Sequence, residues 1–169
     1  MRFTDFLKAT VLVSAGAATA LAAVTVIGAG DEGDPIVVYV ALAWWALAAV
    51  YGMLLGRRAE TSPPIARLLA EARTETTLPE VQPARVLLNR LWPLVFSTVG
   101  AGALAFLFPQ VPAVAAGFAI IWALAWRRQE MAVTAIEDRD GARFYVERTS
   151  PVSRIKLVRT PGFRTARPV

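Results

Sequence analysis

Two residue types are missing from this chain: its 169 residues include no cysteine and no histidine. Disulfides, thiol nucleophiles, imidazole bases and Cys/His metal sites are therefore excluded within the chain. Charge is also missing from the four longest apolar stretches. The composition is 56% hydrophobic, and these stretches approach the length needed to cross about 30 Å of hydrocarbon at 1.5 Å per residue. We therefore expect an integral membrane protein.

The apolar stretches predict an all-α membrane protein with four transmembrane helices arranged as two antiparallel hairpins. The predicted spans are about 7–29, 36–56, 91–108 and 111–126, which make a transmembrane region over 1–126. A cytoplasmic loop at 57–90 separates the hairpins, and a basic tail occupies 127–169. Pro93 and Pro112 are both expected in the first turn of their helices, where a missing N–H does little harm.

The first span follows a short segment that contains Arg2 and Lys8, a pattern that also precedes secretory signal sequences. Its apolar run is roughly 22 residues, against about 7–15 in a signal sequence. An uncleaved helix is therefore favoured. Cleavage would leave three spans and would not change the orientation of the others.

Lys and Arg are distributed unevenly among the segments outside the spans. Two of the 18 lie in 1–8, six in 57–90 and ten in 127–169, while 31–35 and 109–112 have none. Because positive residues are retained on the cytoplasmic side, we expect both termini and the central loop in the cytoplasm. The abundance of Arg and Ala is typical of a high-GC bacterial genome, so the expected location is the plasma or inner membrane.

Two segments outside the spans have a regular pattern. Apolar residues recur at helical spacing over 65–72, which predicts a short amphipathic helix on the inner leaflet or, equally, a soluble connector. The tail has β-prone runs at 133–137 and 142–146 around an Asp-Gly pair, which predicts a small cytoplasmic β-hairpin. A third strand at 155–158 and a type II turn at 160–163 are expected to follow.

Small residues recur every four positions in the second span, at Ala48, Gly52 and Gly56. This spacing lets helix backbones approach closely. It predicts helix packing, either within one bundle or between two copies of the chain.

Trp44 and Trp45 fall near the middle of the second span, where indole N–H groups need hydrogen-bond partners. We expect them to pack against the small residues of the first span, where Thr19 is the hydroxyl nearest in depth. A ligand or lipid site lined by the two rings is the alternative.

The end of the tail is basic and has no acid from 148 to 169. Its basic residues are Arg148, Arg154, Lys156, Arg159, Arg164 and Arg167. A basic run next to the membrane attracts anionic lipid by about 1 kcal/mol per charge. Contact with anionic lipid is therefore favoured over an acidic protein partner, and nucleic acid is not expected.

The spans offer no residue for intramembrane chemistry. Coupled transport normally requires an ionisable group inside the membrane. Small multidrug transporters share the length and the four spans, but they depend on a membrane-embedded carboxylate, which this chain lacks. Paired carboxylates occur only in predicted turns, and 138–141 is not followed by the remaining ligands of a calcium loop.

We therefore expect no catalytic residue, metal site or cofactor. The sequence favours a non-enzymatic structural or accessory subunit of a membrane assembly, associated with other membrane proteins or with copies of itself. The alternative is a small uncoupled transporter, a lipid flippase or a holin-like pore formed by oligomers.

Overall fold

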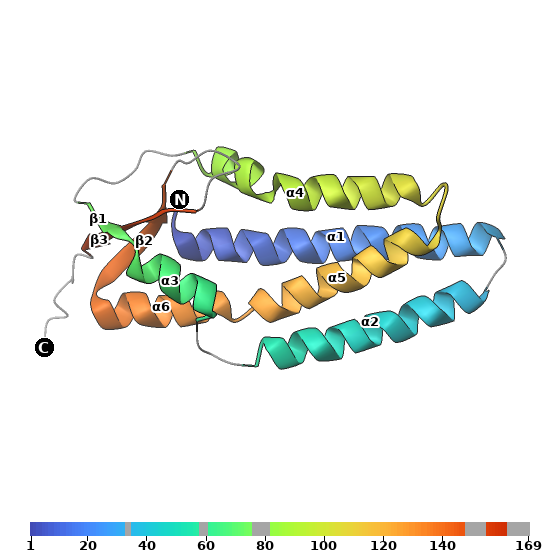
Figure 1. The fold of residues 1–169 in the computed structure, drawn as a ribbon, viewed down its shortest axis with the longest axis horizontal. Coiled ribbons are helices and arrows are strands. Elements are labelled where there is room, and N and C mark those ends of the chain that lie inside the picture. The colour runs from blue at the N-terminus through green and yellow to red at the C-terminus, as the bar shows by residue number, and fades with distance from the viewer. Residues whose placement is uncertain (33–34, 58–60, 76–81, 148–154, 162–169) are drawn as a thin grey trace, which may run out of the picture. The chain divides into compact units, whose positions relative to one another are not determined.

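A computed structural model describes residues 1–32, 35–57, 61–75, 82–147 and 155–161 of the chain (Figure 1). The helices are α1 (Phe3–Glu32), α2 (Pro35–Leu55), α3 (Pro63–Ala70), α4 (Pro83–Leu104), α5 (Gln110–Trp126) and α6 (Gln129–Asp140). The strands are β1 (Arg73–Thr74), β2 (Ala142–Val146) and β3 (Leu157–Pro161). The chain divides into two compact units: a helical unit (Ala9–Arg58 and Leu91–Arg127) and a mixed unit (Met1–Lys8, Ala59–Arg90 and Arg128–Val169).

The described part of the chain is mostly helical, and three of its helical stretches are long and apolar enough to cross a membrane. These are Phe3–Gly30, Pro35–Leu55 and Gln110–Asp140, the last of which contains α5 and α6. They correspond to three of the four predicted spans.

The predicted span 91–108 is the exception. α4 begins at Pro83 and ends at Leu104, so it starts earlier and stops sooner than predicted. Arg85 and Arg90 lie in its first half. The uncharged part that follows is roughly 21 Å long at 1.5 Å per residue, which is shorter than the roughly 30 Å of bilayer hydrocarbon.

The two prolines expected in first turns differ in their placement. Pro112 lies in the first turn of α5, as predicted. Pro93 lies inside α4, so the prediction of a first-turn position is wrong. Pro83 takes the first helical position of α4 instead, where its fixed φ is favourable.

α2 and α5 pack side by side in the helical unit (Figure 1). Leu21 of α1, Ala101 of α4 and Ala116 of α5 form a buried cluster, and Trp45 of α2 packs against it. Most buried residues of this unit are small. Small residues at helix interfaces allow close approach of the backbones.

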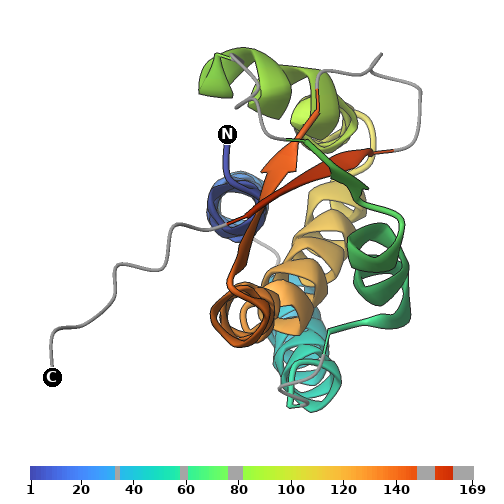
Figure 2. The same ribbon diagram turned by 90° about the vertical axis from the view of Figure 1, so that its left-hand side faces the viewer.

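The mixed unit contains a three-stranded sheet with the order β1-β3-β2 (Figure 2). β2 and β3 are antiparallel, with Val146 opposite Leu157, and β1 is parallel to β3. Arg2 bridges to Tyr145 on the free side of β2, and the Val146 N–H donates to the Met1 carbonyl at 3.1 Å. The start, the middle and the end of the sequence therefore meet in one sheet.

The predicted β-hairpin is wrong, because 133–137 lies in α6 and only 142–146 forms a strand. Gly141 has a φ of 60°, and its N–H donates to the Glu137 carbonyl. The Asp-Gly pair thus ends a helix with a left-handed cap instead of turning a hairpin. Both motifs place glycine at positive φ, so the dipeptide alone does not distinguish them.

The partner of β2 is β3, at Leu157–Pro161, which lies later than the third strand predicted at 155–158. The first half of the turn predicted at 160–163 is therefore strand, and that prediction is wrong there. The second half of the turn lies outside the described residues.

α3 confirms the helix predicted over 65–72. Ile65 on its apolar side is only 1% exposed, which favours the connector interpretation over a helix lying on the inner leaflet. Other large apolar side chains buried in the mixed unit include Phe3, Phe6, Leu7, Val86, Val133, Phe144, Val146, Leu157 and Val158.

Candidate functional site

The indole N–H groups of Trp44 and Trp45 bond to backbone carbonyls of α5. Trp45 Nε1 donates to the Ala113 carbonyl at 2.8 Å, and Trp44 Nε1 donates to the Val114 carbonyl at 3.3 Å. The expected hydroxyl partner on the first span, Thr19, is wrong, because both indole N–H groups bond to α5 instead. A carbonyl oxygen has two lone pairs, so a helical carbonyl can accept an indole N–H beside its helix bond.

The predicted packing residues form a buried stripe: Ala48 and Gly52 lie on α2, and Gly56 follows directly after its end. A Cβ atom at Gly52 would lie 2.9 Å from Leu124 Cβ and 3.1 Å from Ile121 Cα, and one at Gly56 would meet the Leu124 backbone. Both glycines therefore allow α2 to approach the α5 backbone more closely than any larger residue would permit. In the single chain this stripe is covered by α5.

Gly117 makes the matching approach from α5. A Cβ atom there would overlap the indole ring of Trp44. The same indole lies edge-on to the Phe118 ring, with 5.8 Å between ring centroids. The two tryptophans therefore belong to the α2–α5 interface.

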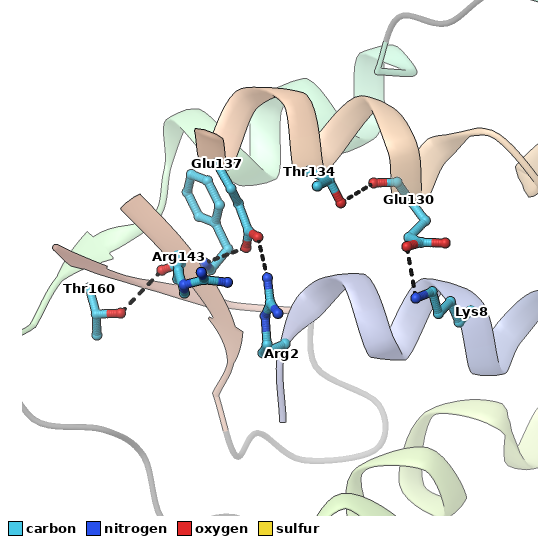
Figure 3. A network of polar contacts seen from close by, with 8 residues as sticks. Arg2, Lys8, Glu130, Thr134, Glu137, Arg143 and Thr160 are labelled. Carbon is cyan, nitrogen blue, oxygen red and sulfur yellow. Dashed lines mark hydrogen bonds and ion pairs between the residues drawn. The ribbon is translucent and has the colours of Figure 1, made fainter. Parts of the chain in front are cut away.

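A buried carboxylate, Glu137, ties three segments of the mixed unit together (Figure 3). Its side chain is 2% exposed; Oε2 accepts a hydrogen bond from Arg2 Nη2 at 2.8 Å, and Oε1 accepts one from the Phe144 N–H at 3.0 Å. The bond to Glu137 raises the pKa of Arg2, against the opposing effect of burial. Charge-assisted bonds of this kind are stronger than neutral ones.

Two further contacts join α6 to the rest of the mixed unit. Lys8 Nζ lies 3.0 Å from Glu130 Oε1 (Figure 3), and Gln129 Oε1 accepts a hydrogen bond from the Ser62 N–H at 2.9 Å. The Lys8 side chain is 56% exposed, and exposed ion pairs contribute less than about 1 kcal/mol each. Of the two ion-paired acids of α6, Glu137 is therefore expected to contribute more to the stability of the mixed unit than Glu130.

Sequence reasoning misses this polar network. It uses Arg2 and Lys8 only as positive charges beside a span, and it places Glu137 at the end of a strand. Glu130 and Glu137 are seven residues apart, which puts them on one face of a helix. That spacing is the signal in the sequence, but it becomes visible only if 129–140 is recognised as helical.

Of the basic residues predicted to contact anionic lipid, Lys156 and Arg159 lie within the described ranges. The other four lie outside them: Arg148, Arg154, Arg164 and Arg167. Arg159 lines a hollow of about 300 Å³ together with Arg139 and Asp140. Lys156 lines a different hollow, of about 220 Å³, together with Arg73. The structure therefore does not bring these two residues to one site.

The Arg159 hollow combines charge with apolar walls. Arg139 Nε donates to Asp140 Oδ1 at 2.8 Å, and this hydrogen bond lowers the pKa of Asp140. Arg139 and Asp140 neutralise each other, so Arg159 gives the hollow a net positive charge. Leu69 and Phe144 supply apolar wall surface. Such a hollow fits an anionic group next to an apolar one.

Within the described ranges, no group of three or more Asp or Glu side chains is placed to hold a metal ion. The expectation of no metal and no cofactor stays a prediction. No protein family, curated protein or solved structure matches this chain.

Proposed function

We propose that this chain is a four-span membrane protein that carries a folded cytoplasmic unit and acts without catalysis, as a structural or accessory subunit of a membrane assembly. The observation that carries the proposal is that the mixed unit is built from three segments far apart in the sequence. Met1–Lys8, Ala59–Arg90 and Arg128–Val169 belong to one compact unit, although apolar helices lie between them in the sequence. A chain of this kind displays a folded binding surface beside the bilayer.

The mixed unit also supports four spans rather than three. One compact polar unit lies on a single side of a membrane, so a chain that leaves it after Lys8 and rejoins it at Ala59 crosses an even number of times. The same holds between Arg90 and Arg128. If α5 crosses the membrane, a second crossing is needed between Arg90 and Arg128, and α4 is the other helix in that segment. A short helix such as α4 crosses with local thinning of the bilayer.

Large apolar side chains that face away from neighbouring helices support the bilayer location. Tyr39 and Leu47 on α2 are 71% and 66% exposed, and Phe96 on α4 is 72% exposed. Soluble monomers rarely expose large contiguous apolar patches. Lipid tails are as apolar as these side chains, so they cover them without loss.

The mixed unit contains most of the Lys and Arg residues of the chain. Retention of positive charge on the inner side supports a cytoplasmic location for it and for both termini. Lys156, Arg159 and the other basic residues of the tail would then face anionic lipid or an acidic partner. Anionic lipid attracts each such charge by about 1 kcal/mol near the surface.

The topology is tested by labelling single cysteines in intact cells and in inverted vesicles, since the natural chain has no cysteine background. Ala66→Cys in α3 is expected to react only from the cytoplasmic side. Gly30→Cys and Gln110→Cys are expected to react only from outside. Reaction of Gln110→Cys from the cytoplasmic side alone would contradict the crossing of α4.

The role is tested by purifying the full chain from its native membrane in mild detergent. We expect other membrane proteins to co-purify, and we expect Arg159→Glu to weaken their retention, because it reverses the charge of the hollow. Arg67→Glu, an equal reversal at an exposed position of α3, is the control. A chain that always purifies alone and moves ions or lipids in liposomes would replace this proposal by the transporter alternative.

A further inference from the structure

A groove in the helical unit lies among α1, α4 and α5 and has a volume of about 250 Å³. Its lining residues are Leu21 from α1, Leu94, Ser97 and Thr98 from α4, and Ala115, Phe118, Ala119 and Trp122 from α5. The lining is predominantly apolar, and the residues Phe118 and Trp122 are each 53% exposed. The groove therefore opens onto the outward-facing apolar surface of the unit.

The hydroxyl groups in the groove already have partners. Ser97 Oγ donates to the Leu94 carbonyl at 2.9 Å, and Thr98 Oγ1 donates to the same carbonyl at 2.7 Å. Neither hydroxyl needs a water molecule or a polar ligand to satisfy its donor. The groove thus suits an occupant made of hydrocarbon.

The walls of the groove favour a narrow, flexible chain over a second helix as its occupant. Phe118 and Trp122 both line the groove and are half-exposed, whereas closely packed membrane helices meet through small residues.

We infer that this groove binds one acyl chain of a membrane phospholipid, an inference that rests on the proposed membrane location. Trp122 stacks on Trp126 with 5.6 Å between ring centroids, and the exposed Arg127 follows at the end of α5. Trp122 and Arg127 are separated by roughly 7.5 Å along the helix axis. The groove is thereby continuous with a Trp–Arg pair of the kind that lies at the headgroup level.

The test uses the full chain in vesicles of phosphatidylcholine that contain a small fraction of the same lipid with a photoreactive group in its acyl chain. Cross-links are mapped by mass spectrometry of peptides. We expect them to concentrate in the groove segments of α4 and α5. Ser97→Phe fills the groove, and we expect it to reduce these cross-links roughly tenfold, as for lost contact with about two methylene groups.

Thr19→Phe is the matched control, because Thr19 is exposed, donates to its own helix as Ser97 does, and does not line the groove. We expect it to leave the cross-linking pattern unchanged. Cross-links spread evenly over the outer face of α2 and insensitive to Ser97→Phe would overturn the acyl-chain site but not the membrane location. A complete lack of lipid cross-links would contradict the proposed function itself.

Discussion

Glycine brings helix backbones together in the helical unit, whereas buried charge joins distant segments in the mixed unit. At Gly52, α2 approaches Ile121 of α5 so closely that a Cβ atom does not fit. In the mixed unit, the Glu137 carboxylate accepts hydrogen bonds from Arg2 and from the Phe144 amide. This difference between the two units agrees with their proposed surroundings, which are lipid for the helical unit and water for the mixed unit. In lipid, helices gain little from apolar contact alone and depend on close packing, whereas in water apolar burial drives folding and a buried carboxylate requires partners.

The largest expected effect comes from Glu137→Ala. This change leaves the Phe144 N–H buried without its acceptor and removes the partner of Arg2. We expect a loss of about 3 kcal/mol in the stability of the mixed unit, at the low end for a broken buried pair, because the Arg2 side chain is 37% exposed. Hydrogen exchange of the β2 amides measures this loss.

Glu130→Ala is the control for that change, since it removes an acid of α6 from a more exposed ion pair. We expect it to cost less than about 1 kcal/mol. All five tryptophans lie in the helical unit, so their fluorescence reports that unit separately. If Glu130→Ala destabilised the mixed unit as much as Glu137→Ala, the buried carboxylate would matter no more to this unit than an exposed ion pair.

The second prediction concerns Gly52→Ala in α2. The added methyl group would lie 2.9 Å from Leu124 Cβ, and overpacking of this kind costs about 1–3 kcal/mol. Gly100→Ala in α4 meets open space and is expected to stabilise its helix by up to about 1 kcal/mol. Thermal unfolding in detergent, followed by tryptophan fluorescence, measures both changes. Effects of the same sign would show that close backbone approach does not hold the helical unit.

The two units also differ in how well the sequence predicts them. α1, α2 and α5 follow from uninterrupted apolar runs, because hydropathy is a local property of the chain. The start of α4 at Pro83 is missed, since residues 83–90 carry charge and resemble a loop. The position of an apolar helix can therefore be predicted where a single uninterrupted apolar run defines it.

The mixed unit depends on contacts between segments far apart in the sequence. The run at 133–137 has the composition of a strand, but Val133 is fully buried as part of α6 and Glu137 reaches Arg2. Tertiary packing overrides such weak local preferences. The glycine stripe of α2 is visible in the sequence, but its partner α5 is not, and neither are the carbonyls that accept the indole N–H groups.

The third prediction compares the two tryptophans. Trp45→Phe removes a hydrogen bond of 2.8 Å to the Ala113 carbonyl, and Trp44→Phe removes a longer one of 3.3 Å. We expect a loss of about 1 kcal/mol at Trp45 and a smaller one at Trp44. Circular dichroism during heating in detergent measures both losses without relying on tryptophan emission. A larger loss at Trp44 would indicate that ring packing on Gly117, and not the indole hydrogen bond, decides the interface.

The smallest effect is expected for Asp140→Asn at the end of α6. The hydrogen bond from Arg139 lowers the pKa of Asp140 below its ordinary value of 3.8. A carboxyl group with a lowered pKa stabilises the folded state above its unfolded pKa, and this contribution is lost as the pH falls through the folded pKa. We therefore expect a constant small difference between the natural chain and the variant from about pH 7 to about pH 5, and convergence below about pH 4. Hydrogen exchange at the end of α6 measures it.

Salt separates this exposed pair from the buried one. Arg139 and Asp140 are exposed residues, and the Arg139 side chain is 74% exposed, so raising the ionic strength from about 0.1 M to about 1 M should abolish the effect of Asp140→Asn. The effect of Glu137→Ala should persist under the same salt, because that carboxylate is shielded from ions and its loss leaves a buried amide without an acceptor. If high salt removed the effects of Asp140→Asn and Glu137→Ala equally, the Glu137 pair would behave as a surface ion pair. Buried charge would then no longer distinguish the mixed unit from the glycine-packed helices, and only its apolar core would.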